Sequence, residues 1–176
     1  MNVRHPLLFR AVIAVACSVW GSSASAQSAG MGCLLEAQAG TSRHVLVCPG
    51  RIRITAEAGA RYSLADRNQD GVADGALLRR KALLLETPAG SGAGFSVITP
   101  QAIAAVRGTK WAVDVAGGTT SVFVVDGRVA VQSPTSRSRV VLGPGEGVDV
   151  ERGTDPLEVK RWGAARAAAL LARLGE

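Results

Sequence analysis

The feature that most constrains the fold is an alternating pattern of side chains across residues 95–131. β-Branched and aromatic residues recur at every second position, so an extended chain places them on one face and the polar residues on the other. Gly117-Gly118 and Asp126-Gly127 separate the runs, and both pairs tolerate the positive φ of a tight turn. The pattern predicts three consecutive strands in a meander, with Asp126-Gly127 as a two-residue hairpin turn. The alternating apolar positions are Phe95, Val97, Trp111, Val113, Val115, Val122, Val124, Val129 and Val131.

Several short motifs follow one another in this stretch. Thr99-Pro100 comes before Arg107-Gly108-Thr109, then Asp-Gly-Arg-Val-Ala-Val at residues 126–131, then Leu142 and the glycine-rich residues 143–147. This succession resembles the FecR domain, with the best match over residues 95–150 and weaker similarity back to about residue 50. The resemblance implies a periplasmic β-domain that relays signals from the cell surface, in some relatives to an extracytoplasmic sigma factor. Those regulators also carry a cytoplasmic anti-sigma segment and a membrane span before the domain, and we expect neither in this chain.

The β pattern also extends towards the N-terminus. Strand-like runs continue back to Val45, and Pro49-Gly50 separates two segments whose pattern is similar to that around residues 126–127. This similarity indicates either an internal repeat or only what any two valine-rich hairpins share. We therefore expect a mainly β fold over residues 27–154, an antiparallel or meander domain built as a sandwich or as a β-solenoid.

Residues 155–176 are predicted to form a C-terminal helix. Asp155 is an acceptable cap with Pro156 at the first helical position, although Gly163 leaves the alternative that the helix begins only after it. Gly175 is expected to end the helix. The helix either packs its apolar face on the β-domain or docks on a partner protein or an anionic membrane surface. That face is made of Trp162, Ala165, Ala169, Leu170, Ala172 and Leu174.

Residues 1–26 have the organisation of a secretory signal peptide. Arg4 and Arg10 supply positive charge, an apolar run over residues 11–20 follows, and Ala24-Ser25-Ala26 is a small-residue cleavage site. The run is too short to span a bilayer, which needs about 20 apolar residues. We expect cleavage after Ala26, a periplasmic mature protein and no transmembrane segment in it. The alternatives are an uncleaved anchor and, with less support, a lipoprotein attached at Cys17.

Export changes how the cysteines are interpreted. The mature chain would keep Cys33 and Cys48, an even number in an oxidising compartment, which predicts a disulfide between them. The alternative is two free buried thiols. A zinc site has little support, because these two cysteines and His44 fall short of four ligands.

One segment carries the pattern of a metal site. Residues 66–75, Asp-Arg-Asn-Gln-Asp-Gly-Val-Ala-Asp-Gly, match the first three quarters of an EF-hand calcium loop, with glycine at the sixth position. Leu77 stands at the twelfth position, where a bidentate Glu normally closes the shell, so another carboxylate would have to complete the site. The alternative is a polar β-turn in which side chains bond their own backbone. The predicted ligands are the side chains of Asp66, Asn68, Asp70 and Asp74 and the carbonyl of Val72.

Composition argues against two classes of function. Loss of residues 1–26 lowers the formal net charge of +6 by two, and the remaining basic residues are scattered among few aromatics, which argues against nucleic-acid binding. The mature chain has one histidine, His44, and its carboxylates show no spacing typical of a catalytic pair. We therefore predict no catalytic residue and no enzyme. A hydrolase that uses Asp or Glu is the remaining enzymatic alternative.

Arg107-Gly108-Thr109 is expected to be a structural turn. The planar guanidinium of Arg107 suits two-pronged bonding to carbonyls or to a carboxylate, and with Gly108 it would fix a corner between strands. Ligand binding by Arg107 is the alternative. The sequence as a whole predicts a non-enzymatic protein-interaction or signalling accessory of the periplasm whose partner is an unidentified periplasmic or envelope protein. The alternative function is a calcium-stabilised structural module of the envelope without a signalling role.

Overall fold

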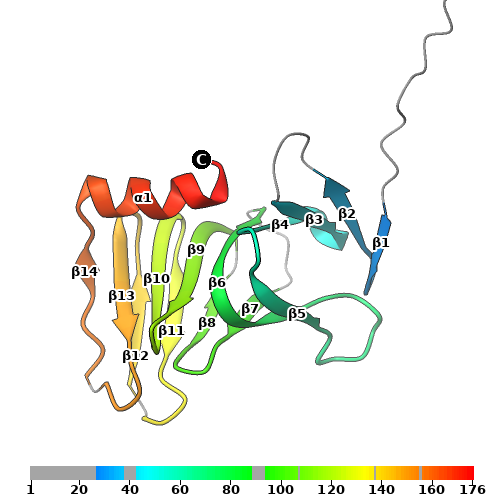
Figure 1. Cartoon of the computed structure of the whole chain (residues 1–176). Coiled ribbons are helices and arrows are strands. Elements are labelled where there is room, and N and C mark those ends of the chain that lie inside the picture. Colours follow the sequence, from blue (N-terminus) through cyan, green and yellow to red (C-terminus); the bar gives the residue numbers. More distant parts are fainter. Residues whose placement is uncertain (1–26, 38–42, 89–93, 107, 137, 155) are drawn as a thin grey trace, which may run out of the picture.

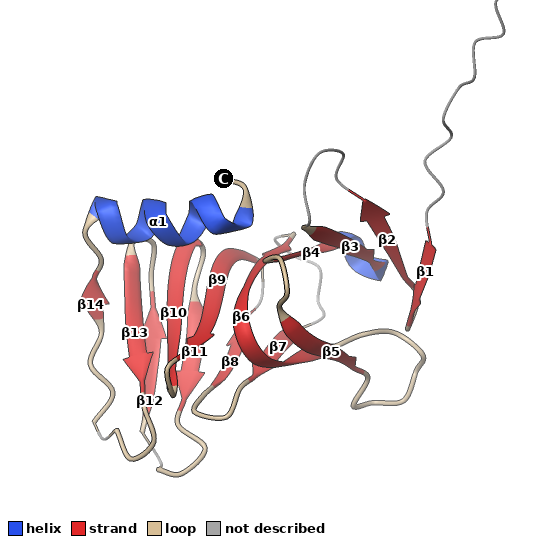
Figure 2. Cartoon of the chain, in the orientation of Figure 1, coloured by secondary structure: helices blue, strands red, loops and turns tan. Residues whose placement is uncertain are grey.

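The structure is a computed structural model, and it describes residues 27–37, 43–88, 94–106, 108–136, 138–154 and 156–176. The predicted signal peptide and its cleavage site lie outside these ranges, as do Arg107 and Asp155. The described chain is mainly β, with one helix near the C-terminus (Figures 1 and 2). The fold class predicted from the sequence is therefore confirmed.

Strands pair into a larger and a smaller sheet that share β6 (Gly75–Thr87). The larger sheet has the order β1-β2-β3-β4-β6-β9-β10-β13-β14, and the smaller sheet has the order β5-β6-β7-β8-β11-β12. The other strands of the larger sheet are β1 (Gln27–Gly30), β2 (Cys33–Ala37), β3 (His44–Cys48), β4 (Ile52–Ala56), β9 (Thr109–Ala116), β10 (Thr119–Asp126), β13 (Glu146–Val150) and β14 (Lys160–Arg161). Those of the smaller sheet are β5 (Arg61–Ala65), β7 (Phe95–Ile98), β8 (Ile103–Val106), β11 (Val129–Gln132) and β12 (Arg139–Leu142).

The two halves of β6 belong to different sheets. Residues 75–80 pair with β5 and β7, whereas residues 81–87 pair with β4 and β9. Lys81, at the junction, has a positive φ of 64°, which marks the irregularity where the strand passes from one sheet to the other. Of the described strand pairs, β6 with β7 is parallel and the others are antiparallel, so the sheet curls back over itself as a half-barrel instead of stacking as a solenoid.

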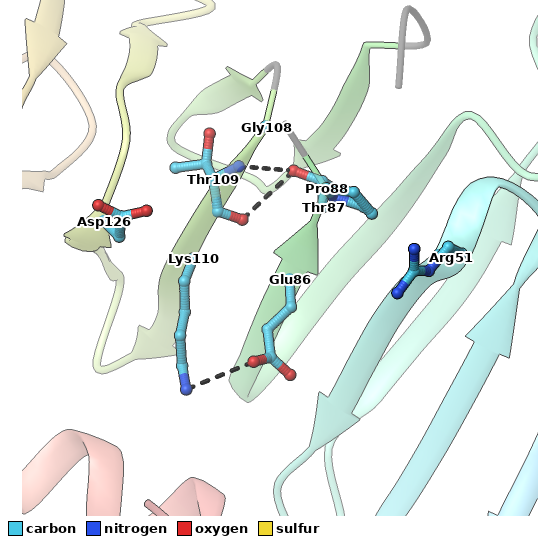
Figure 3. Close-up of a pocket in the computed structure, with 8 residues that line it drawn as sticks. All are labelled: Arg51, Glu86, Thr87, Pro88, Gly108, Thr109, Lys110 and Asp126. Atoms are coloured by element: carbon cyan, nitrogen blue, oxygen red, sulfur yellow. Dashed lines mark hydrogen bonds and ion pairs between the residues drawn. The ribbon is translucent and has the colours of Figure 1, made fainter. Parts of the chain in front are cut away.

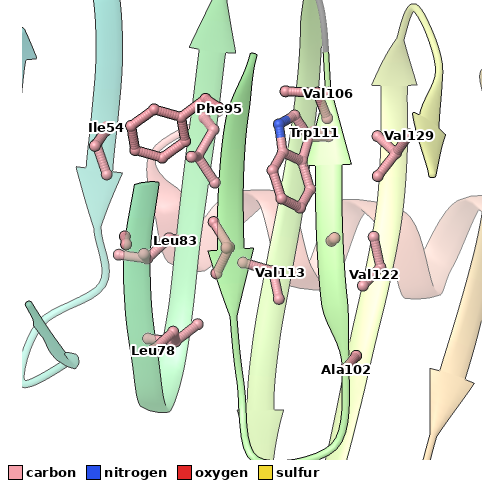
Figure 4. Packing of buried hydrophobic residues seen from close by; sticks show 14 of the residues in the cluster. Ile54, Leu78, Leu83, Phe95, Ala102, Val106, Trp111, Val113, Val122 and Val129 are labelled. Atoms are coloured by element: carbon pink, nitrogen blue, oxygen red, sulfur yellow. The ribbon is translucent and has the colours of Figure 1, made fainter. Parts of the chain in front are cut away.

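The core lies between the two sheets. The inward side chains come from alternate positions of strands on both sides, as the period-two pattern predicts. Trp111 is fully buried in this layer and lies close to Val106 (Figure 4). The residues drawn with labels there are Ile54, Leu78, Leu83, Phe95, Ala102, Val106, Trp111, Val113, Val122 and Val129.

Helix α1 (Ala164–Leu174) covers the outer face of the larger sheet. Leu170 and Leu174 pack in a second apolar cluster with Ala82, Leu84 and Ala112 of the sheet and with Phe123 and Trp162. The Trp162 ring stacks on Phe123 with centroids 5.0 Å apart, and the Arg166 guanidinium lies 3.6 Å from the Trp162 ring centroid. The molecule thus has three layers, helix, larger sheet and smaller sheet.

Charged contacts fix the helix at both ends. Arg173 donates to Asp114 at 2.7 Å and also contacts Glu57, which comes directly after β4. Arg166 donates to Asp149 of β13 at 2.9 Å. Of the two uses predicted for the helix, packing on the β-domain is therefore confirmed.

Two local predictions were wrong. Asp126-Gly127 is a turn but does not close a hairpin, because β10 pairs with β9 and β13 whereas β11 pairs with β8 and β12. The three strands are accordingly no simple meander. Residues 156–163 are not helical and include β14, so the predicted start at residue 155 was wrong and the alternative, a helix that begins only after Gly163, is confirmed. By contrast, Pro49-Gly50 does join a hairpin, β3 with β4, so the two similar segments have different structures and do not form a repeat.

A disulfide joins Cys33 and Cys48, as predicted. Both residues are buried, and they lie at the facing ends of the neighbouring strands β2 and β3. The bond ties β2 to β3 near the N-terminal edge of the larger sheet.

The disulfide is expected to contribute about 3 kcal/mol to the free energy of unfolding, because it closes a loop with a sequence separation of 15 residues. Urea unfolding of the mature protein with and without dithiothreitol measures the difference. The Cys33→Ala, Cys48→Ala variant is the control and should show no further response to the reductant. Equal stability of the oxidised and reduced protein would contradict the prediction.

The carboxylates that hold α1 predict loss of stability in acid. Burial by itself raises the pKa of Glu57, but hydrogen bonding and charge attraction from Arg173 outweigh it, so the pKa lies below its ordinary value of 4.5. The pKa of Asp149 is lowered in the same way, burial being outweighed by Arg166 and Ser121. Groups of this kind stabilise the fold above their unfolded pKa and lose that contribution as the pH falls through the folded value.

We expect Arg173→Met to reduce the free energy of unfolding at neutral pH by about 1 kcal/mol, since the arginine is partly exposed. The variant should also lose less stability than the wild type between neutral and acid pH. The reason is that Arg173 no longer lowers the pKa of Glu57 in the folded protein. Urea titrations at several pH values measure both effects. Arg152→Met, in an exposed turn, is the control and should follow the wild type.

Candidate functional site

Two connections between the sheets meet at one corner of the molecule. The chain passes from β8 to β9 through Gly108 and from β10 to β11 through Gly127. Gly127 has a φ of 84°, and a Cβ there would lie 2.7 Å from the carbonyl oxygen of Gly108, so only glycine fits. Four of the predicted turn residues are therefore brought together at this corner, namely Gly108, Thr109, Asp126 and Gly127.

Buried threonines join the corner to β6. The Thr109 amide donates to Thr87 Oγ1 at 2.9 Å, and Thr87 Oγ1 donates to the Thr109 carbonyl at 3.2 Å (Figure 3). Thr109 Oγ1 also donates to the carbonyl of Arg128 at 3.3 Å. These bonds satisfy polar groups that the change of sheet would otherwise leave without partners.

A small cavity of about 240 Å³ opens beside this corner and is lined by Arg51, Glu86, Thr87, Pro88, Gly108, Thr109, Lys110 and Asp126 (Figure 3). Lys110 Nζ lies 3.4 Å from Glu86 and 2.6 Å from Glu176. Hydrogen bonding to Glu176 raises the pKa of Lys110 above its ordinary value, against a smaller effect of burial. The amine is therefore held protonated and paired, which suits structural bracing and not proton abstraction or nucleophilic attack.

The predicted calcium loop is closed by its own hydrogen bonds. Asp66 accepts from the amides of Asp70 and Gly71, the latter at 2.8 Å, and Asp70 accepts from the amide of Val72 at 2.8 Å. The Asn68 amide group donates to Asp70 at 2.8 Å. These are the bonds expected of the polar turn that was the alternative interpretation.

The third predicted carboxylate of the loop, Asp74, has a cation of the chain beside it. Arg67 Nε donates to Asp74 at 3.1 Å, and the Arg67 amide bonds the same oxygen at 3.2 Å. Within the described ranges, no three His, Cys, Asp or Glu side chains gather so that they could hold a metal ion. Calcium binding stays a prediction, and any site would need Asp74 to exchange Arg67 for the ion.

A surface that the sequence interpretation did not single out lies along β5. Among the described residues β5 pairs only with β6, so its other edge is free. On one side of that edge is a mainly apolar groove of about 580 Å³, bounded by the N-terminal strands. A second hollow of about 480 Å³ lies along β5 and the neighbouring residues of β6. The groove is lined by Gly30, Met31, Leu35, His44, Leu46, Tyr62, Ser63 and Leu64, and the hollow by Ala60, Arg61, Tyr62, Ser63, Leu77 and Arg79.

The half-buried side chains of this surface are part of the open end of the core. Leu35, Tyr62 and Leu64 pack against the main apolar cluster without being fully covered, and burial raises the pKa of the Tyr62 hydroxyl. The alternation of Arg61, Tyr62, Ser63 and Leu64 is the sequence signal that could have indicated an edge strand with one apolar face. Its open position could not be inferred without the strand order.

Among the residues that the structure describes, no helix is both long enough and apolar enough to cross a bilayer. Comparison with curated proteins gave no match. Comparison with protein families matched residues 35–130 to the family described as FecR protein. The matched region begins within β2, well before residues 95–150 where the sequence motifs gave the best resemblance, and it ends in β11.

Solved structures confirm the fold. Two crystal structures of a candidate anti-sigma factor from Parabacteroides distasonis ATCC 8503, at 1.65 and 2.50 Å resolution, each superpose with a TM-score of 0.58 at 22% sequence identity. Each comparison covers 73% of this chain and 60% of the other chain. At this identity the likeness establishes a shared architecture and leaves activity and partners to separate argument.

The close approach at the corner predicts that two glycines of nearly equal φ differ in their tolerance of alanine. Gly127→Ala should destabilise the protein by about 2 kcal/mol or more, because the new Cβ meets backbone as well as an unfavourable φ. Gly118→Ala is the matched control, since Gly118 has a φ of 85° and no atom within 4 Å of the added Cβ. Urea unfolding of both variants measures the two losses, and equal losses would show that the close approach at the corner is unimportant.

Calcium binding is tested by calorimetric titration of the mature protein beside an Asp66→Ala, Asp70→Ala variant. A calcium loop of this kind predicts a dissociation constant of about 0.1 to 1 mM for the wild type and no heat for the variant. A thermal melt of the variant without calcium controls for loss of the turn. Flat traces for both proteins would leave residues 66–74 as a hydrogen-bonded turn.

Proposed function

Because the chain belongs to the FecR protein family, we propose that it is a non-enzymatic signalling accessory that acts by binding another protein of the periplasm or envelope. Regulation is supported by the family match and by the shared architecture with a candidate anti-sigma factor. Location outside the cytoplasm is supported by the disulfide and by the signal-peptide pattern of residues 1–26.

The observation that carries the proposal is the free edge of β5 beside two surface hollows. An exposed strand edge presents amide and carbonyl groups that another chain can pair with, and adjacent hollows can select its side chains. The cavity beside the sheet corner, in contrast, contains a protonated lysine held between carboxylates. Its chemistry supports stabilisation of the corner and gives no basis for an enzymatic role.

Affinity purification of the tagged full chain from its own host, after mild cross-linking, tests the proposal. A stoichiometric envelope or periplasmic protein, retained after high-salt washing, supports a role in relay. Recovery of cell-wall or membrane material alone would refute it and favour the other function, a calcium-stabilised structural module. That second function has one specific observation in its favour, the spacing of oxygen-bearing side chains in residues 66–74.

A further inference from the structure

We propose that the free edge of β5 accepts an extended segment of a partner protein as an additional strand, and that this segment alternates apolar and acidic residues. The inference rests on the proposed function and deepens it, since it names the surface and the chemistry of the partner. It follows from three features of the described residues, which are the unpaired edge, the two hollows that share it, and a group of arginines.

The faces of β5 differ, since Tyr62 and Leu64 pack against the core whereas Arg61 and Ser63 are exposed. Both hollows include Tyr62 and Ser63, but the apolar groove continues to Leu64, Leu35 and Leu46, whereas the other hollow continues to Arg61 and Arg79. Figure 1 shows β5 facing the N-terminal strands across the open side of the curled sheet. A strand that pairs with β5 directs successive side chains to opposite faces. One set of the partner strand's side chains would therefore enter the apolar groove, and the other set would lie over the arginines.

The arginines beside the edge explain why the second set should be acidic. Arg61 and Arg80 are direct cross-strand partners in the β5–β6 pair, an arrangement that is unfavourable for like charges. Arg61, Arg79 and Arg80 are all exposed, and in the described part of the chain no salt bridge to any of them is formed, whereas the adjacent Lys81 pairs with Glu57 at 3.5 Å. A carboxylate from a paired strand would relieve the repulsion and gain charge-assisted hydrogen bonds.

Other occupants fit the surface less well. Two copies of this chain paired antiparallel about the centre of β5 would place Arg61 of each copy opposite Ala65 of the other, which gives the arginine no carboxylate. A nucleic acid would find no stacked aromatic platform on this strand, whose one aromatic residue, Tyr62, is half-buried among apolar side chains. An anionic membrane surface could use the arginines but would leave the strand edge without hydrogen-bond partners.

Fluorescence anisotropy with defined peptides tests the proposal on the mature protein. The probe is a labelled peptide in which valine and glutamate alternate over seven residues. Three control peptides are its lysine counterpart, a peptide of the same composition with valines and glutamates in separate blocks, and the alternating peptide with every second amide N-methylated. We expect the alternating glutamate peptide to bind and each control to bind at least about fivefold more weakly.

Charge reversal at one position gives a variant that should fold well and bind poorly. Arg61→Glu places a carboxylate opposite Arg80, so the free energy of unfolding should stay the same or rise, while affinity for the glutamate peptide should fall by about fivefold. Arg139→Glu is the matched control, because Arg139 is an exposed arginine on β12, which within the described residues pairs only with β11. It should bind the peptide as the wild type does.

Three outcomes would overturn the inference. These are equal binding of the alternating and block peptides, unchanged affinity of Arg61→Glu, and binding to phosphatidylglycerol vesicles that depends on Arg61 while no peptide binds. A stoichiometric partner that still binds Arg61→Glu normally would refute this surface and leave the proposed function intact. Peptide binding without any protein partner in the cell would support the site and refute the proposed function.

Discussion

The structure depends on β6 being buried on both of its faces. In its second half, successive side chains face different apolar layers, with Leu83 and Leu85 in the core between the sheets and Ala82 and Leu84 beneath helix α1. A strand that faces water on one side could not carry this run, and a strand in a single sheet could not connect the two halves of the domain. The helix, the larger sheet and the smaller sheet all take their positions from this strand.

The alternating pattern was enough to predict the class of fold but not the path of the chain. Valine-rich runs show which face of a strand is buried, and that information is local. Asp126-Gly127 has the composition of a hairpin turn, yet the strands on its two sides belong to different sheets, because Gly127 lies against Gly108 at a corner. Which strands pair across a turn is decided by contacts far along the chain, and residue type at the turn does not encode them.

The predicted sites also differed in how far their residues alone could define them. The Cys33–Cys48 bond could be predicted because two cysteines remain after the predicted signal peptide, and they have one possible pairing. The loop at residues 66–74 could not be interpreted fully, since Asp and Asn suit both a cation and their own backbone amides. The β5 surface was not predicted at all. Whether a strand has a free edge depends on the order of all the strands, and no residue type in β5 indicates it.

The sharing of β6 between sheets also sets an order on folding. As the chain is made from its N-terminus, β5 and the first half of β6 can pair at once, whereas the second half must wait for β9, which comes later in the sequence, to complete its apolar face. During that interval leucines that end in the core are uncovered, which is the state in which β proteins associate wrongly. The chain therefore needs either rapid synthesis of the segment up to β9, so that the leucines are covered soon, or a chaperone that covers them until then.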